Sequence, residues 1–278
     1  MAARLNCDVS DGVWEALHAE CERTGDSLAR VVDRNLSSAL GLDRHSLFQV
    51  STSTALVEGV FRGAVTVGDL RRHGDFGLGT YDGLDGELVM VDGACYRVGG
   101  CGSVAAADDG WEVPFAVVTR FVPDDASALA SFATLADLEA ALDDLRPSEN
   151  VFVGLRIEGR FARLSLRAAC KAGAGEGLVA ATSHQSEFTA RDVDGTLVGF
   201  WTPIYATAVN VPGYHFHFLA TDHSVGGHVL DAHAGPLEVE LHVESDLHIA
   251  IPQTAEFLQA DLSGDAAEAL RIAESPRT

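Results

Sequence analysis

The stretch 211-VPGYHFHF-218, followed by 226-GGH-228, decides how the rest of the chain is interpreted. Side chains alternate between the two faces of a strand, so His215 and His217 point the same way and the phenylalanines beside them point the opposite way. A turn in the ten residues that follow would fold the chain into a hairpin and bring His228 beside the first pair. Three imidazoles on one sheet face predict an open metal site with room for water or substrate.

The spacing of the three histidines does not by itself establish a metal site. Two histidines at alternate positions of a strand are also common on an ordinary polar sheet face. His223 competes as a ligand, because it lies five residues before His228. It falls in the expected turn, where a solvated histidine is the usual case, and we therefore rank it below His228.

Composition and charge narrow the class of protein. The 278 residues carry a formal net charge of −22 and are 47% hydrophobic. This length and apolar content predict one or two domains with a sizeable core, and the acidic balance argues against nucleic acid or a membrane as a partner of the whole chain. The five cysteines include no CxxC pair, which disfavours a disulfide framework and a thiolate zinc site. No apolar run reaches membrane-spanning length and the N-terminus lacks an apolar signal region, so we expect a cytoplasmic protein.

Residues 1–45 predict a separate N-terminal module. We expect a short strand at residues 4–9 and two amphipathic helices, the first beginning at Ser10 or Asp11 and ending at Thr24-Gly25. This strand–helix–helix order weakly resembles the ribbon-helix-helix DNA-binding fold. The module carries more acidic than basic side chains, however, so we favour a dimerisation or docking role over DNA binding.

Residues 46–278 predict a second region, which is dominated by β-sheet. Glycine turns alternate here with β-branched runs, as is typical of strands joined by tight turns. Apolar residues at helical spacing interrupt the strands in a few places. The elements expected are a short helix at 65–72, helices at 126–145 and 265–273, and a hairpin formed by strands 151–157 and 161–168.

Several long motifs follow one another between Leu47 and about Glu274. They are 47-LFQVST-52, 73-HGDFGLGT-80, 84-LDGEL-88, 113-VPFAVVT-119, 195-GTLVGFWTPIYA-206, 210-NVPGYHFHFLATD-222, 226-GGHVLD-231 and 260-ADLSGD-265. In this order they resemble the α-acetolactate decarboxylase family. Several long motifs in a shared order are a more specific signal than any single spacing, and they favour the metal site over an ordinary polar sheet face.

The resemblance implies a fold, a reaction and a set of residues. The fold is a β-rich mixed α/β fold of two domains, with mixed and antiparallel sheets, a few helices and a homodimeric assembly. The reaction is that of a carboxy-lyase, which converts the small molecule 2-acetolactate to acetoin and CO2 with Zn²⁺. The family's metal-binding histidines match His215, His217 and His228. Its acid in the DGE motif matches Glu87, and its C-terminal glutamate matches Glu274.

The arginine that meets the substrate in the family matches Arg167. The sequence departs from the family here, because Ala168-Ala169-Cys170 stands where the family has Thr-Val-Pro. We therefore keep Arg156 as the alternative. Residues 1–45 also depart from the family's usual start.

A mechanism follows from the chemistry of the reaction. Decarboxylation needs a group that takes up the electron pair left by CO2. Zinc held by three neutral histidines keeps its full charge and open positions, so we expect it to chelate the keto and hydroxyl oxygens and stabilise an enediolate. The arginine would hold the carboxylate by a bidentate pair. Glu87 or Glu274 would then protonate the enediolate carbon, if a dry pocket raises its pKa.

Two other functions stay open on sequence alone. Another metalloenzyme on a β-barrel, such as a cupin-like dioxygenase or isomerase, shares the HxH strand. Cupins normally add a glutamate a few residues later, and residues 218–220 offer none. The second alternative is a regulatory sensor that joins a DNA-binding module to the enzyme fold. The full set of histidines and glutamates favours retained catalysis.

Overall fold

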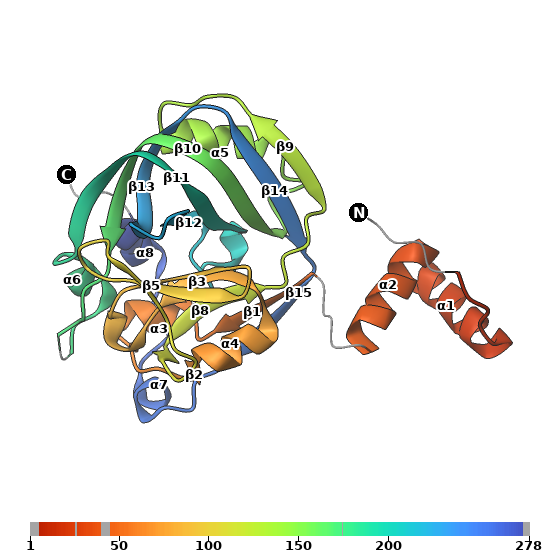
Figure 1. Ribbon diagram of the computed structural model, residues 1–278. Coiled ribbons are helices and arrows are strands. Elements are labelled where there is room, and N and C mark those ends of the chain that lie inside the picture. Colours follow the sequence, from red (N-terminus) through yellow and green to blue (C-terminus); the bar gives the residue numbers. More distant parts are fainter. Residues whose placement is uncertain (1–5, 26, 40–44, 174, 275–278) are drawn as a thin grey trace. The chain divides into compact units, whose positions relative to one another are not determined.

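Figure 1 shows the computed structural model of the protein. The chain divides into two compact units, Met1–Arg44 and His45–Thr278, which are described separately below. Over the part of the chain that the structure describes, no helix is long and apolar enough to cross a membrane. The described residues are 6–25, 27–39, 45–173 and 175–274.

The first unit holds two helices, α1 (Asp11–Thr24) and α2 (Leu28–Ala39). The first helix ends as predicted, because Gly25 adopts a left-handed backbone (φ 76°) that only glycine takes up without strain. The expected strand is wrong for residues 6–9, which form no strand, while residues 4 and 5 lie outside the described residues. A strand needs a neighbour for its backbone hydrogen bonds, and within the described residues none pairs with this segment. Trp14 of α1 is half exposed.

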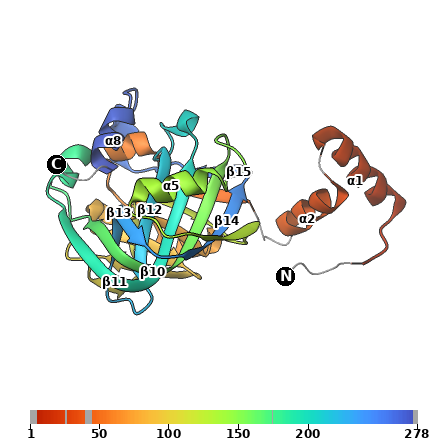
Figure 2. The same cartoon turned by 90° about the horizontal axis from the view of Figure 1, so that it is seen from above.

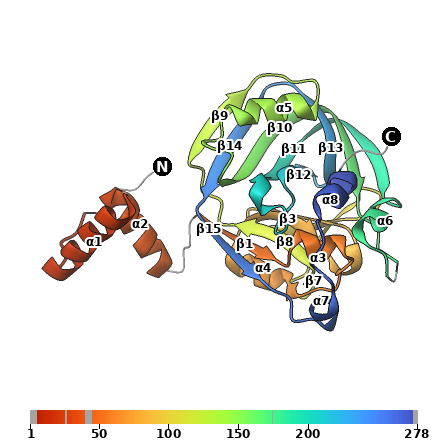
Figure 3. The same cartoon turned by 180° about the vertical axis from the view of Figure 1, so that it is seen from behind.

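The second unit is built on two sheets that pack against each other (Figures 1 and 3). All strand pairs are antiparallel except β1 with β15, so the fold is the β-rich mixed α/β fold predicted. The seven-stranded sheet has the order β15 (Asp246–Ala250), β1 (Ser46–Val50), β8 (Phe115–Thr119), β3 (Phe76–Thr80), β4 (Glu87–Val91), β5 (Ala94–Val98) and β6 (Val104–Ala106). The six-stranded sheet has the order β11 (Ser186–Thr202), β12 (Gly213–Ala220), β13 (Gly226–Ala234), β10 (Phe152–Ala168), β14 (Leu237–Glu244) and β9 (Asp125–Leu129).

Short helices cover the outside of these sheets. Helix α5 lies across the six-stranded sheet and buries Leu138 and Leu142 on it (Figure 2). Helices α3, α6 and α8 contact one another on another side (Figure 3). The elements outside the two sheets are α3 (Ser53–Val57), β2 (Val65–Thr66), α4 (Val67–His73), η1 (Asp82–Leu84), β7 (Glu112–Val113), α5 (Leu135–Asp143), α6 (Leu178–Thr182), η2 (Ile204–Ala206), α7 (Ala255–Gln259) and α8 (Ala267–Glu274).

The hairpin expected between residues 151 and 168 is wrong, because β10 runs through this segment without a turn. β11 pairs with β10 along almost its whole length. On its other edge β10 pairs first with β14 and then with β13. Gly159 (φ 151°) lies where the partner changes, and a β-carbon there would come within 2.5 Å of the Leu237 side chain. The glycine therefore lets the strand bend between two neighbours instead of reversing it.

The helix expected over residues 126–145 is wrong in its first part, which forms β9 at the edge of the six-stranded sheet. Helix α5 begins only after Thr134. The Thr134 hydroxyl accepts a hydrogen bond from the Asp137 N–H, and the Asp137 carboxylate accepts one from the Thr134 N–H. A matching capping box of Thr66 and Asp69 begins α4, two residues after the predicted start. The final helix, α8, is confirmed.

Gly79 shows how tightly the strands near the centre of the seven-stranded sheet pack. All five residues of β3 are buried. A β-carbon on Gly79 would overlap the Phe115 carbonyl and lie 2.7 Å from the α-carbon of Ala116. Backbone atoms cannot rotate away as a side chain can, so β3 and β8 would have to separate.

We expect Gly79→Ala to lower the free energy of unfolding by about 1–3 kcal/mol through this overlap. Denaturant unfolding of the full chain measures the change. Gly110→Ala is the matched control, because nothing lies near its added β-carbon, and we expect a change within about 0.5 kcal/mol. Equal effects of the two substitutions would contradict the close packing of β3 on β8.

Candidate metal centre

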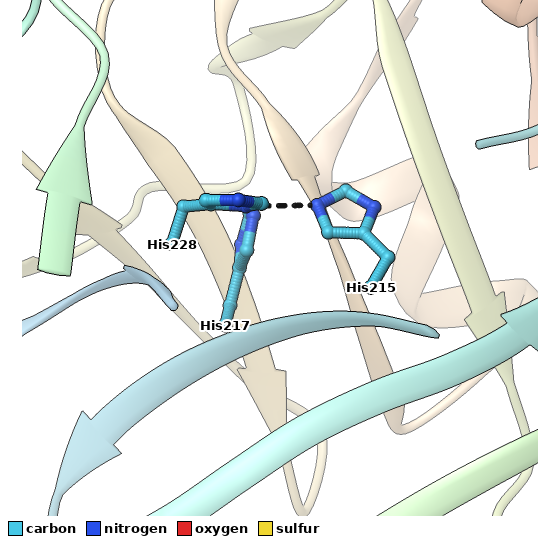
Figure 4. Close-up of side chains that lie close together, drawn as sticks. All are labelled: His215, His217 and His228. Carbon is cyan, nitrogen blue, oxygen red and sulfur yellow. Dashed lines mark hydrogen bonds between the residues drawn. The ribbon is translucent and has the colours of Figure 1, made fainter. Parts of the chain in front are cut away.

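The hairpin of β12 and β13 gathers the three histidines as predicted. His217 pairs directly with His228 across the two strands, and His215 precedes His217 by two positions on the same face. One nitrogen from each ring lies within 4.8 Å of the others. Figure 4 shows the rings converging, with the 3.1 Å contact between His215 Nε2 and His228 Nδ1 drawn as a dashed line.

The environment keeps these rings neutral. Burial, followed by the charge of Arg167, lowers the pKa of His215 to about 3. Burial and the neighbouring His215 lower the pKa of His217 to about 3, and burial also lowers the pKa of His228. His217 Nδ1 donates to the Leu88 carbonyl at 2.8 Å, which leaves its Nε2 as the nitrogen with a free lone pair. Neutral imidazoles anchored in this way can bind a metal ion through their free lone pairs.

Glu87, the first residue of β4, reaches the cluster from the opposite sheet. Its Oε1 accepts a hydrogen bond from the Ala169 N–H at 2.9 Å, and its Oε2 lies 3.6 Å from His217 Nε2. Only 7% of the residue is exposed. Burial raises the pKa of Glu87 to about 7, and the charge of Arg167 opposes the shift. This carboxyl therefore holds a proton in part of the molecules near neutral pH.

Glu274, the last residue of α8, approaches from the helical side. Its Oε2 lies 3.1 Å from His228 Nε2 and 3.9 Å from His215 Nε2. Burial raises the pKa of Glu274, and Arg167 and His217 oppose the shift. A quarter (25%) of the side chain nevertheless stays exposed, so this carboxyl can exchange protons with water.

Arg167, near the end of β10, lies at the same place. It is 6% exposed. Its guanidinium donates to the Ala273 carbonyl, and Nη2 lies 3.7 Å from Glu274 Oε2. Within the described residues its buried Nε has no hydrogen-bond partner. An arginine held on one side and unpartnered on another can receive an anionic group.

The competing residues lie elsewhere. Arg156 pairs with Asp92 (2.8 Å) and Glu158 (2.7 Å), and the three side chains line a separate cavity. His223 is exposed in the turn between β12 and β13 and packs on the Tyr96 ring. The structure therefore brings Arg167, and neither Arg156 nor His223, to the cluster.

One cavity joins these groups and adds a residue that the sequence analysis missed. Its polar lining includes the three histidines, both glutamates, Arg167 and Gln185. Gln185 follows α6 and is 5% exposed, and its Oε1 has no hydrogen-bond partner among the described residues. No periodicity or motif marks this glutamine, because it lies in a short connection before β11.

Residues 47–264 match the family described as alpha-acetolactate decarboxylase. The chain belongs to the alpha-acetolactate decarboxylase family. It is 40% identical to the alpha-acetolactate decarboxylase of Methanosarcina mazei over 229 residues, which cover 82% of this chain and 80% of that protein. It is 38% identical to that of Methylococcus capsulatus over 242 residues, or 87% and 93% of the two chains. The crystal structure of the Bacillus subtilis strain 168 enzyme superposes with a TM-score of 0.80, at 34% identity, over 83% of this chain and all of that one.

Membership in this family makes the chain an enzyme, a carboxy-lyase. The match includes the three histidines, Glu87 and Arg167, but it ends before Glu274. The case for Glu274 therefore depends on its 3.1 Å contact with His228 rather than on the family match.

Proposed function

We propose that this enzyme converts 2-acetolactate to acetoin and CO2 with a zinc ion held by His215, His217 and His228. One observation supports the proposal above the others. Three neutral imidazoles, of which His217 and His228 are buried and His215 is 11% exposed, share one cavity with two glutamates and a buried arginine, in a chain of the alpha-acetolactate decarboxylase family.

The donor set fits zinc. Two nitrogen ligands of a tetrahedral zinc lie about 3.3 Å apart, because each is about 2.0–2.1 Å from the metal. The 3.1 Å between His215 Nε2 and His228 Nδ1 is close to that spacing. Three protein ligands leave a position open, as in catalytic zinc sites. A zinc ion bound here would supply Lewis-acid polarisation of the keto and hydroxyl oxygens of 2-acetolactate.

Arg167 suits the carboxylate of the substrate. Its unpartnered Nε lies beside Nη groups on a rigid planar fork, which matches the two oxygens of a carboxylate. The Ala273 carbonyl fixes the other side of the guanidinium. Held in this way, the arginine would orient the bond between the carboxylate and its carbon before that bond breaks.

The two glutamates divide the proton chemistry. When CO2 leaves, the electron pair of the broken bond remains on the substrate, whose carbon then takes up a proton. We assign this proton to Glu274, because burial raises its pKa and its exposed quarter allows reprotonation from water. We assign to Glu87 a role at the metal side, because its Oε2 lies 3.6 Å from His217 Nε2, the nitrogen that would bind the ion.

The domain limits remain a proposal as well. We place the catalytic region at residues 46–278, which is supported by a family match that begins at residue 47. The N-terminal extension, residues 1–45, would serve dimerisation or docking. A homodimer and a cytoplasmic location stay predictions from the sequence.

The test of the proposed function is acetoin formation from racemic 2-acetolactate. We expect activity to be lost after chelation and recovered with zinc, because the three imidazoles alone supply no Lewis acid. Colorimetric detection of acetoin measures both steps, with unchelated protein as the control. Folded, zinc-loaded protein that forms no acetoin would contradict the proposal.

Arg167→Gln should lower kcat/KM by about a hundredfold, because two charge-assisted hydrogen bonds to the carboxylate are worth roughly 3 kcal/mol. Arg156→Gln is the matched control on the same strand and should retain activity. Steady-state kinetics on both variants, after circular dichroism confirms folding, measures the difference. If Arg156→Gln loses activity and Arg167→Gln keeps it, then Arg156 and not Arg167 binds the substrate carboxylate.

Glu274→Gln should lower kcat by about a hundredfold or more, as expected for loss of a general acid. Because protonation on one face sets the configuration of acetoin, the ratio of its enantiomers should also change. Chiral chromatography of the product measures that ratio. Glu87→Gln is the comparison variant: it should slow turnover and leave the enantiomer ratio intact. The assignment fails if Glu87→Gln, and not Glu274→Gln, alters the ratio.

A further inference from the structure

A second cluster of possible metal ligands lies where the two sheets meet. His45 immediately precedes β1, Asp124 lies between β8 and β9, and His242 is on β14. One ligand atom from each lies within 4.8 Å of the others. β14 leads here from the six-stranded sheet into β15 of the other sheet, beside the start of β1 (Figure 3). The cluster shares no residue with the three-histidine site.

The distances suit shared ligation better than direct hydrogen bonding. Asp124 Oδ2 lies 3.5 Å from His242 Nδ1 and 3.7 Å from His45 Nδ1. Both distances are too long for hydrogen bonds. The 3.5 Å between Asp124 and His242 Nδ1 is near the separation of about 3.3 Å between two ligands of one zinc ion. The two imidazoles stack with 4.8 Å between their ring centres.

Buried polar atoms at this place lack partners. His242 is fully buried and Glu244 is 4% exposed. The Val122 backbone faces His242 and the Thr119 hydroxyl faces Glu244, but within the described residues no ring nitrogen of His242 and no carboxylate oxygen of Glu244 has a hydrogen-bond partner of normal geometry. Buried polar groups are almost always satisfied, so unpartnered neighbours of this kind call for a ligand. A cation would satisfy them together.

The two ring nitrogens of His242 face different carboxyl groups, as in a metal site where one nitrogen binds the ion and the other is held by a hydrogen bond. His242 Nδ1 faces Asp124, while Nε2 faces Glu244 Oε1 at 3.7 Å. Metal-binding histidines commonly donate their second ring N–H to a carboxylate or a backbone carbonyl. Glu244 is placed to accept from His242 in this way. His45 Nδ1 donates to the Val243 carbonyl at 2.7 Å, which leaves Nε2 with the free lone pair.

The charges around the cluster also favour a cation. Asp124 and Asp246 act on Glu244, and Asp124 and Asp75 act on His242. The His45 imidazole also faces His242 and acts on it in the opposite sense to these carboxyl groups. Burial raises the pKa of Glu244 to about 8, and a divalent ion bound beside it would favour its ionised form as the acceptor of the His242 N–H.

We propose that His45, Asp124 and His242 bind a second divalent metal ion of the zinc class, with Glu244 holding His242 in position. Two imidazoles and one carboxylate suit zinc and similar first-row ions. A fourth position is left for water on the side of Asp124, which is 39% exposed. The ion joins segments from both sheets, and its role is structural.

The test counts metal ions in untagged, full-length protein. The protein is stripped with a chelator, loaded with zinc, dialysed and analysed by elemental mass spectrometry. We expect two equivalents in the unaltered chain and one in His217→Ala, which removes the three-histidine site. Adding Asp124→Asn to His217→Ala should remove the remaining equivalent. The matched control adds Asp125→Asn, an exposed neighbour outside the cluster, and should keep it.

Thermal unfolding gives an independent measurement, because an ion that binds only the folded state raises the Tm. Zinc should raise the Tm of His217→Ala and of its Asp125→Asn derivative but not that of its Asp124→Asn derivative. If Asp124→Asn fails to fold, His45→Ala, at a side chain that is 30% exposed, replaces it. The proposal is overturned if His217→Ala binds no zinc, or if the Asp124 and His45 substitutions leave its equivalent in place.

Discussion

The register of β12 between β11 and β13 is the constraint on which the metal centre depends. Phe216 and Phe218 are fully buried on the face opposite the histidines. Their rings lie over Gly199 and Gly195 of β11, where a β-carbon would overlap Phe216 and come within 2.5 Å of Phe218. A slip of one residue would turn both rings away from the core and bury the histidines there instead. Two glycines and two phenylalanines thus set where the imidazoles point.

Burial of the metal centre shifts the pKa values of its histidines and of its glutamates in opposite directions. The same burial that lowers the pKa values of the histidines raises those of Glu87 and Glu274. Removing water disfavours every charged form, so burial favours the neutral imidazole and the protonated carboxyl. The positive charge of Arg167 also lowers the pKa of His215, whereas it opposes the rise in the pKa values of both glutamates. Burial in one cavity therefore favours both the neutral form of the three histidines and the protonated form of the two glutamates.

The sequence predicts the parts of this centre that are local. His215 and His217 share a face by strand periodicity, and the glycine pair before His228 marks the returning strand. Arg167 and Glu274 are 107 residues apart, and no spacing rule joins them, so only the resemblance to a family singled them out. Gln185 had neither a pattern nor a matched motif. Long-range packing of α8 and α6 brings these side chains together.

The wrong predictions have equally specific causes. Glycine after glutamate at 158–159 is typical of a tight turn, yet the neighbours of β10 on both edges hold it extended. Leu129 and Phe132 have helical spacing with the leucines of α5, although pairing of β9 with β14 decides the local structure. In both places contacts with distant strands outweigh the local pattern.

The backbone at His45 adds to the case for the junction cluster. Its φ of 61° is uncommon for a residue other than glycine. The His45 carbonyl accepts hydrogen bonds from the Ser245 and Asp246 N–H groups at 2.9 and 3.0 Å, and its ring donates to Val243. Such conformations persist where surrounding contacts hold them, and they cluster at ligand sites. These hydrogen bonds come from the corner between β14 and β15, the same corner that presents His242 and Glu244. Asp124 already accepts a hydrogen bond from the Val243 N–H of this corner at 2.8 Å, and an ion bound here would join it to both imidazoles as well.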